Sequence, residues 1–200
     1  MPKFSEAEKE KIRLEMMGCA HRCFIDKGLK STSIEEITSS VHIAKSSFYV
    51  FFESKEALYL ELLDLEGQEI EKKVWPKVEK AKDVRAAIKA YLHAMASELE
   101  SHVLTQRLIT NLEEYKMVSR KVNPQYSATQ TLRSIVPLMA FIKKYKAFNE
   151  LIDEDVEVIA GVIRATLAMI IHKKDVDKKI YPKVQSLLFD AVANELTKQS

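Results

Sequence analysis

Apolar residues recur every three or four positions along most of the chain, as they do on one face of an α-helix. The first such stripe predicts a helix over residues 5–27, and Gly28 is a natural stop after it. Ser33 stands three residues before a glutamate, in the form of a capping box, and predicts a short helix that starts at the next residue. Ser54 is a second helix-capping residue, and it predicts a long helix that ends or bends at Pro76.

The rest of the chain keeps this helical spacing and contains few residues that break helices. Only 4 glycines and 5 prolines occur in 200 residues. Further helices are predicted over residues 83–99, 104–115, 124–142, 153–172 and 180–198. We therefore expect an all-α protein. Neither a signal peptide nor an apolar run of membrane-spanning length is found, so we expect a cytoplasmic protein without a membrane partner.

The stretch from Thr32 to Leu58 has a more specific pattern. It predicts two short helices joined by a tight turn at residues 41–43, with the long helix starting directly afterwards. The second short helix, residues 45–51, has small, hydroxyl-bearing and basic side chains on one face and aromatic side chains on the other. A small polar face on a rigid helix pair suits a groove in DNA better than a pocket for chemistry.

The overall charge adds no support for nucleic-acid binding. The formal net charge is only +2, and residues 1–56 contain as many acidic as basic side chains. Affinity for phosphate must therefore come from the local placement of lysines and hydroxyls, and from helix N-termini.

This stretch resembles the DNA-binding domain of the TetR family of bacterial transcriptional regulators. Three positions depart from the family's usual pattern, because Thr38, His42 and Ser46 stand where alanine, glycine and glycine are common. The residues that match the pattern are Gly28, Thr32, Ser33, Ile34, Ile37, Ile43, Ala44, Lys45, Ser47, Phe48, Tyr49, Phe51, Phe52, Ser54, Lys55, Glu56 and Leu58.

The resemblance implies an N-terminal three-helix head with a helix-turn-helix, joined by a long helix to a larger helical domain. Residues 1–54 would form the DNA-binding domain, and residues 55–200 the effector-binding and dimerisation domain. The function it implies is that of a ligand-responsive, sequence-specific, dimeric repressor that a small hydrophobic effector releases from its operator. Its expected partners are double-stranded operator DNA, that effector and a second copy of the chain.

The DNA contacts are expected from the second short helix and from two helix N-termini. Side chains at the start of the second helix of a helix-turn-helix reach base edges, and helix N-termini bind phosphate. The family's pattern adds a phosphate contact from Tyr49, and Phe51 takes a position often filled by histidine or tyrosine. The candidate DNA-binding residues are Thr32, Ser33, Lys45, Ser46, Ser47, Tyr49, Val50, Phe51 and Lys55.

Apolar, aromatic and methionine side chains in the larger domain are candidates for an effector pocket, because such side chains suit a hydrophobic ligand. The alternative, which applies more often to any single one of them, is that they are ordinary core residues. The candidates are Trp75, Tyr91, Met95, Leu99, Leu108, Leu112, Tyr115, Met139 and Phe141.

The predicted helix over residues 153–172 is apolar on more than one side, so several of its faces must be covered. A second copy of the chain is one possible cover, and the alternative is that this helix is the central core helix of its domain. Gly161, Ala165 and Ala168 would allow another helix to approach closely. The candidate interface residues are Ile159, Val162, Ile163, Thr166, Ile170, Val184, Leu187, Leu188 and Ala191.

Other classes of function find less support in the sequence. The glycines are isolated, and the histidines lack the spacings of zinc or di-iron sites, so we expect neither an enzyme nor a metal or other cofactor. Cys19 and Cys23 share a helix face without a basic neighbour, and are read as small core residues, with redox sensing as the alternative. The rival functions are a helical protein-interaction module without DNA binding, and a TetR-like activator.

Overall fold

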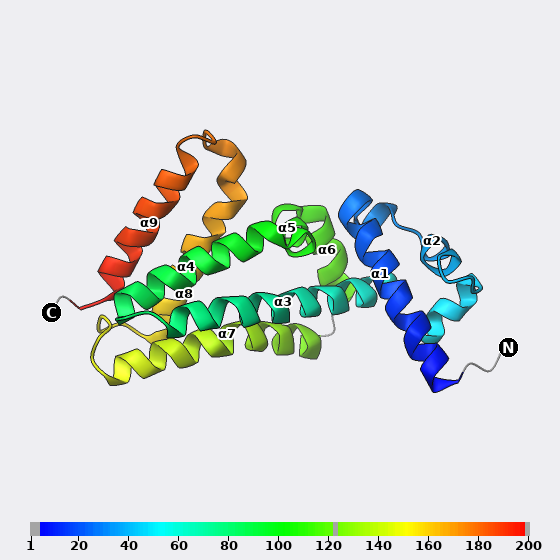
Figure 1. Cartoon of the computed structure of the whole chain (residues 1–200), viewed down its shortest axis with the longest axis horizontal. Coiled ribbons are helices and arrows are strands. Elements are labelled where there is room, and N and C mark those ends of the chain that lie inside the picture. Colours follow the sequence, from blue (N-terminus) through cyan, green and yellow to red (C-terminus); the bar gives the residue numbers. More distant parts are fainter. Residues whose placement is uncertain (1–4, 122–123, 199–200) are drawn as a thin grey trace. The chain divides into compact units, whose positions relative to one another are not determined.

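The computed structural model describes residues 5–121 and 124–198 (Figure 1). For residues 121 and 124–134 it describes the backbone and not the side chains. Throughout the described part of the chain every regular element is a helix, and the one pairing of extended residues is an isolated bridge between Leu151 and Thr197. The predicted all-α class is confirmed. The elements are α1 Glu6–Ser31, α2 Ile34–Ser39, the 3₁₀-helix η1 Lys45–Val50, α3 Lys55–Glu79, α4 Val84–Ser101, α5 Val103–Thr110, α6 Leu112–Lys121, α7 Pro124–Ala147, α8 Val156–Leu167, the 3₁₀-helix η2 Ala168–Asp175 and α9 Tyr181–Leu196.

The predicted helix starts are confirmed by their capping hydrogen bonds. The Ser33 hydroxyl accepts the Glu36 N–H at 3.1 Å, and the Ser54 hydroxyl accepts the Ala57 N–H at 3.0 Å. Ser5 caps α1 in a complete capping box. Gly28 interrupts α1 with φ 83° and ψ 168°, so the predicted stop is real, although another helical turn follows it to Ser31.

Two of the predicted helices have different ends in the structure. Pro76 lies inside α3, which continues to Glu79 with the buried residues Val74 and Val78 on either side of the proline. This burial outweighs the loss of one backbone hydrogen bond at the proline. The single helix predicted over residues 104–115 is two helices, because the Asn111 side chain accepts the N–H groups of Glu113 and Glu114 and thereby starts α6.

The chain divides into two compact units. The first contains residues 1–66 and 103–124, so α5 and α6 pack with the helix-turn-helix and against α1. Its core surrounds Tyr59, whose ring lies 5.1 Å from that of Phe24, both fully buried. The expected functional division after residue 54 therefore does not coincide with the division into compact units.

The second unit contains residues 67–102 and 125–200. Its core forms where α4 packs against both α8 and α9, and where these two helices pack against each other. The largest fully buried side chains there include Ile88, Leu92, Leu138 and Phe189. None of the helices described is long and apolar enough to cross a membrane.

Candidate nucleic-acid interface

The helix-turn-helix lies where the sequence predicts it, with α2 as its first helix and η1 as its second. The turn is closed by hydrogen bonds from the His42 N–H to the Ser39 carbonyl and from the Ile43 N–H to the Thr38 carbonyl, both 3.2 Å. His42 adopts φ 55°. Histidine is among the residues that enter this left-handed region more readily than most, so the turn keeps its geometry without glycine.

The short helix η1 has one buried and one exposed face. Phe48 is fully buried and stacks at 5.6 Å on Phe52, which ties η1 to the core of the first unit as the sequence predicts. Tyr49 and Val50 are each 60% exposed, which is unusual for side chains of their size. The exposed side chains of η1 are Lys45, Ser46, Tyr49 and Val50, while Ser47 and the following Phe51 are half-buried.

A surface depression of about 560 Å³ brings most of the predicted contact residues together. It is bordered by the capped N-termini of α2 and α3 and by two side chains of η1. Two glutamates, Glu53 and Glu56, also border it, so an approaching phosphate would meet both signs of charge. The lining residues are Thr32, Ser33, Ile34, Lys45, Tyr49, Glu53, Ser54, Lys55 and Glu56.

Lys55 and Thr32 are used internally. The Lys55 ammonium donates to the Thr32 carbonyl at 2.6 Å, and burial lowers the pKa of Lys55 below its ordinary value. The Thr32 hydroxyl is buried and donates to the Gly28 carbonyl at 2.8 Å. These bonds hold the start of α3 against the loop before α2. The expectation that the Thr32 hydroxyl faces a phosphate does not agree with this placement.

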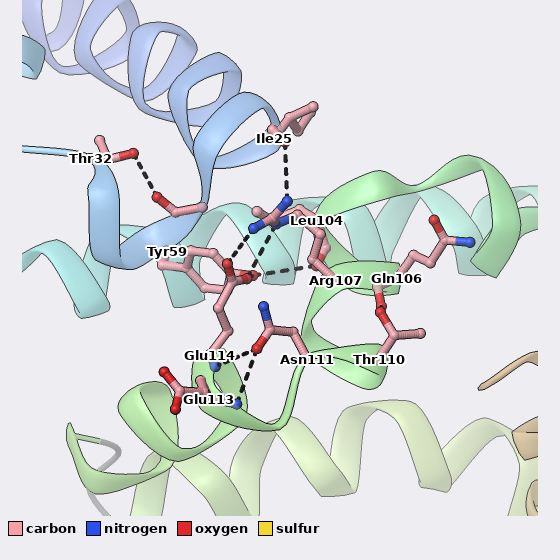
Figure 2. Close-up of polar contacts among 11 residues, drawn as sticks. Ile25, Thr32, Tyr59, Leu104, Gln106, Arg107, Thr110, Asn111, Glu113 and Glu114 are labelled. Carbon is pink, nitrogen blue, oxygen red and sulfur yellow. Dashed lines mark hydrogen bonds and ion pairs between the residues drawn. The ribbon is translucent and has the colours of Figure 1, made fainter. Parts of the chain in front are cut away.

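A buried polar network lies behind the helix-turn-helix, and sequence reasoning did not anticipate it (Figure 2). The Arg107 guanidinium of α5 donates to the Glu114 carboxylate of α6 at 2.6 and 3.3 Å, and to the Ile25 carbonyl of α1 at 3.4 Å. The Tyr59 hydroxyl donates to the same carboxylate at 3.1 Å. Burial and the Glu114 charge raise the pKa of Tyr59. The network holds α5 and α6 against the break in α1 at Gly28.

A second polar contact joins α1, α3 and α5 within the same unit. The half-exposed His21 ring lies 3.1 Å from the carboxylate of Glu66. The other oxygen of that carboxylate accepts the backbone N–H and the hydroxyl of Thr105, at 2.9 and 2.6 Å, and so caps the start of α5. These partners lie 39 and 45 residues apart in the sequence, so no local pattern could have revealed them.

The family model of bacterial regulatory proteins of the tetR family matches residues 19–62, which include the whole helix-turn-helix. The helix-turn-helix segment of the chain is therefore that of the TetR family. The resemblance seen in the sequence is confirmed. Proteins of this family are transcriptional regulators and not enzymes.

The chain is also similar to individual proteins and to solved structures. It is 46% identical over 57 residues to YuxN of Bacillus subtilis (strain 168), an uncharacterized HTH-type transcriptional regulator, in a match of 28% of this chain and 19% of that protein. It is 23% identical over 173 residues to the HTH-type transcriptional repressor KstR2 of Rhodococcus jostii (strain RHA1), covering 84% and 71% of the two chains. A crystal structure of a TetR family transcription regulator from Marinobacter aquaeolei VT8 aligns with a TM-score of 0.63 at 12% identity, covering 98% and 100%.

The effector-pocket candidates of this TetR chain are divided between the two compact units. Leu108, Leu112 and Tyr115 belong to the first unit, where Leu112 and Tyr115 are largely exposed. The others belong to the second unit, and they are Trp75, Tyr91, Met95, Leu99, Met139 and Phe141. In that unit the Trp75 ring lies 5.4 Å from Tyr91 and 6.1 Å from Phe141, within the hydrophobic core.

The dimer-interface candidates are also divided, by burial. Ile159, Ile163, Thr166 and Ile170 are buried within the second unit, so their own chain already covers them. This burial agrees with the alternative that α8 is a core helix on that face. The candidates that remain exposed are Val162 on α8 and Val184, Leu187, Leu188 and Ala191 on α9.

Proposed function

We propose that this TetR-family chain is a sequence-specific DNA-binding repressor that acts as a homodimer in the cytoplasm and is controlled by a small hydrophobic effector. The observation that carries the proposal is the exposed face of η1. Its lysine, serine, tyrosine and valine side chains stand on a buried phenylalanine and beside two capped helix N-termini.

The DNA contacts follow from this arrangement. Lys45 and Ser46 lie at the start of η1, the part of a recognition helix that reaches base edges, and a lysine there suits the acceptors of guanine. Val50 offers an apolar surface to a thymine methyl group. Tyr49 and Ser33 are exposed beside the depression and would donate to phosphates. Because the Lys55 ammonium is bound to a carbonyl, the phosphate contact at this position would come from the backbone N–H groups at the N-terminus of α3.

The proposed dimer uses the outer faces of α8 and α9. Val158 and Val162 on α8 lie one turn apart and are exposed, and α9 carries a matching exposed row. Helices α8 and α9 of each copy would together form a four-helix arrangement that buries both rows. Two heads are needed because operator half-sites lie about 34–36 Å apart and are read together.

The proposed effector control involves the second unit. Trp75, Tyr91 and Phe141 form an aromatic group there, and such groups bind hydrophobic ligands when a neighbouring side chain moves. Helix α3 contributes residues to both units, so it would transmit the effect of a bound effector to the helix-turn-helix. An effector that binds more tightly to a conformation unable to bind DNA would weaken operator binding. The coupling free energy between the two sites would be about 1–3 kcal/mol. Repression is supported by the relative KstR2, which is named a repressor.

The decisive experiment is a fluorescence-anisotropy titration with DNA from upstream of the protein's own gene, at several salt concentrations. We expect saturable binding that weakens steeply with salt. Lys45→Ala should weaken binding and relax the preference at one base pair by about 1–3 kcal/mol, whereas Tyr49→Phe should weaken binding to all sequences alike. Lys80→Ala removes an exposed lysine from the second unit and serves as the charge-matched control.

An absence of binding at low salt would refute the proposal and favour the protein-interaction module. Equal losses for Lys45→Ala on every operator variant would show that Lys45 contacts a phosphate instead of a base. An activator would bind the same DNA, and a reporter gene behind that DNA would show increased rather than decreased expression.

A further inference from the structure

Helix α1 carries a pair of thiols that the proposed DNA-binding role does not use. The sulfurs of Cys19 and Cys23 lie 4.0 Å apart, and both cysteines are free. Cys19 is buried and Cys23 is half-buried, so one side of the pair remains open to solvent. A carboxylate oxygen of Glu36 from α2 lies 3.6 Å from the Cys23 sulfur. The group therefore stands at the joint between α1 and the first helix of the helix-turn-helix.

These separations are those found between neighbouring ligands of one metal ion. With bonds of about 2.3 Å to sulfur and about 2.1 Å to oxygen, two sulfurs of a tetrahedral site stand about 3.8 Å apart, and a sulfur and an oxygen about 3.6 Å. The observed 4.0 Å between the two sulfurs and 3.6 Å between the Cys23 sulfur and the Glu36 oxygen are close to these values. At present the Cys23 thiol donates a hydrogen bond to that Glu36 oxygen, which holds the carboxylate beside the pair.

We propose that Cys19 and Cys23, with Glu36 as a third ligand, bind a thiophilic divalent cation such as Cd²⁺ or Zn²⁺. The ion would be held by two thiolates and one carboxylate oxygen, with water as the fourth ligand. Each binding event replaces two thiol protons with one divalent cation and releases both protons to solvent. No cluster of three or more metal-binding side chains is already assembled within residues 5–121 and 124–198. Glu36 must therefore turn toward the sulfurs when the ion enters.

The present partner of Glu36 is Lys27, whose ammonium lies 2.7 and 2.5 Å from the two carboxylate oxygens. The pair is exposed, and exposed ion pairs contribute little to stability. Displacing the lysine by a metal ion therefore costs little free energy. Burial, together with the neighbouring Cys19 and Glu36, raises the pKa of Cys23 to about 11. Because metal binding replaces thiol protons, it depends on pH.

The test is a titration of the purified, fully reduced protein with Cd²⁺, followed by the ultraviolet sulfur-to-cadmium charge-transfer band. The chain contains only two cysteines, so any such band reports on this pair. We expect one Cd²⁺ per chain, and an apparent affinity that rises about one hundredfold per pH unit, as the release of two protons requires. Cys19→Ser and Cys23→Ser should each abolish the bidentate band while leaving the helical circular dichroism unchanged.

The carboxylate ligand is tested by a matched pair of variants on α2. Glu36→Gln should weaken Cd²⁺ binding at least about tenfold while the band persists, whereas Glu35→Gln, one residue away and exposed, should not change the affinity. The proposal is overturned if no band forms with excess Cd²⁺, or if one ion joins two chains. Equal affinities for the two glutamine variants would remove Glu36 from the site.

Discussion

Replacing Gly28 with alanine should destabilise the first unit strongly. Gly28 has φ 83° and ψ 168°, a region of backbone conformation occupied almost solely by glycine. A Cβ atom at this position would lie well inside 3.0 Å of the Arg107 guanidinium and of the Glu114 carboxylate, closer than real Cβ atoms approach other atoms. The substitution therefore disturbs both the backbone and the buried ion pair behind the helix-turn-helix.

The size of the effect follows from these two contributions. The unfavourable backbone conformation costs about 1–3 kcal/mol, and loss of one charge-assisted hydrogen bond of the displaced pair costs about 1.5–3 kcal/mol. Lower entropy of the unfolded chain returns about 0.4–1 kcal/mol. The expected loss is thus about 2–5 kcal/mol, a large part of the roughly 5–15 kcal/mol of a typical domain.

The assay is urea unfolding followed by circular dichroism, with Gly18→Ala as the matched control in the same helix. Gly18 is helical, and a Cβ there would meet its nearest neighbour, the Arg22 side chain, at an ordinary 3.7 Å. We expect this control to be neutral or more stable by up to about 1 kcal/mol. In an Arg107→Ala background, Gly28→Ala should cost less, because one of the two clashing groups is absent. If Gly28→Ala and Gly18→Ala were equally stable, the reasoning about Gly28 would be wrong.

Three further predictions concern burial, charge and assembly. Glu114→Gln should lower the unfolding free energy by about 1–3 kcal/mol, because it leaves the Arg107 guanidinium without its buried partner charge, and thermal unfolding measures this. Burial raises the pKa of Tyr91 to about 12. The corresponding stabilisation of the folded state, about 3 kcal/mol, is complete below pH 10 and is lost as the pH rises toward 12. The free energy of unfolding of Tyr91→Phe should therefore depend less steeply on alkaline pH. Leu187→Asp, on the exposed row of α9, should convert the dimer to a folded monomer in sedimentation experiments. Phe148→Asp, at an equally exposed position outside α8 and α9, should leave the dimer intact. A monomeric wild-type protein would contradict the proposed interface.

The features predicted correctly are those specified by neighbouring residues. The caps at Ser33 and Ser54 depend on a hydroxyl and an N–H three residues later, and both formed as expected. The turn at His42 and the break at Gly28 depend on local backbone conformation. The burial of Phe48 follows from the alternation of faces on one short helix. Such features can be read from spacing because their partners lie within about one helical turn.

The features that escaped prediction depend on partners far apart in the sequence. Lys55 lies at a helix start, where a phosphate contact is a reasonable expectation, but its ammonium is taken by a carbonyl 23 residues away. Four interface candidates on and after α8 are covered by their own chain, because α4 and α9 pack on that face. An apolar stripe indicates that one face of a helix must be buried, but it does not indicate which other helix or chain buries it.

The sequence by itself determined the helical class, the helix-turn-helix and the family, because each rests on the spacing of residues within a short segment. Only the tertiary structure decided that α5 and α6 belong with the head, and that Arg107, Glu114 and Tyr59 join them to the break at Gly28. The physical reason is that a buried charge must find its partner wherever the fold brings one, and no local periodicity records which partner that is.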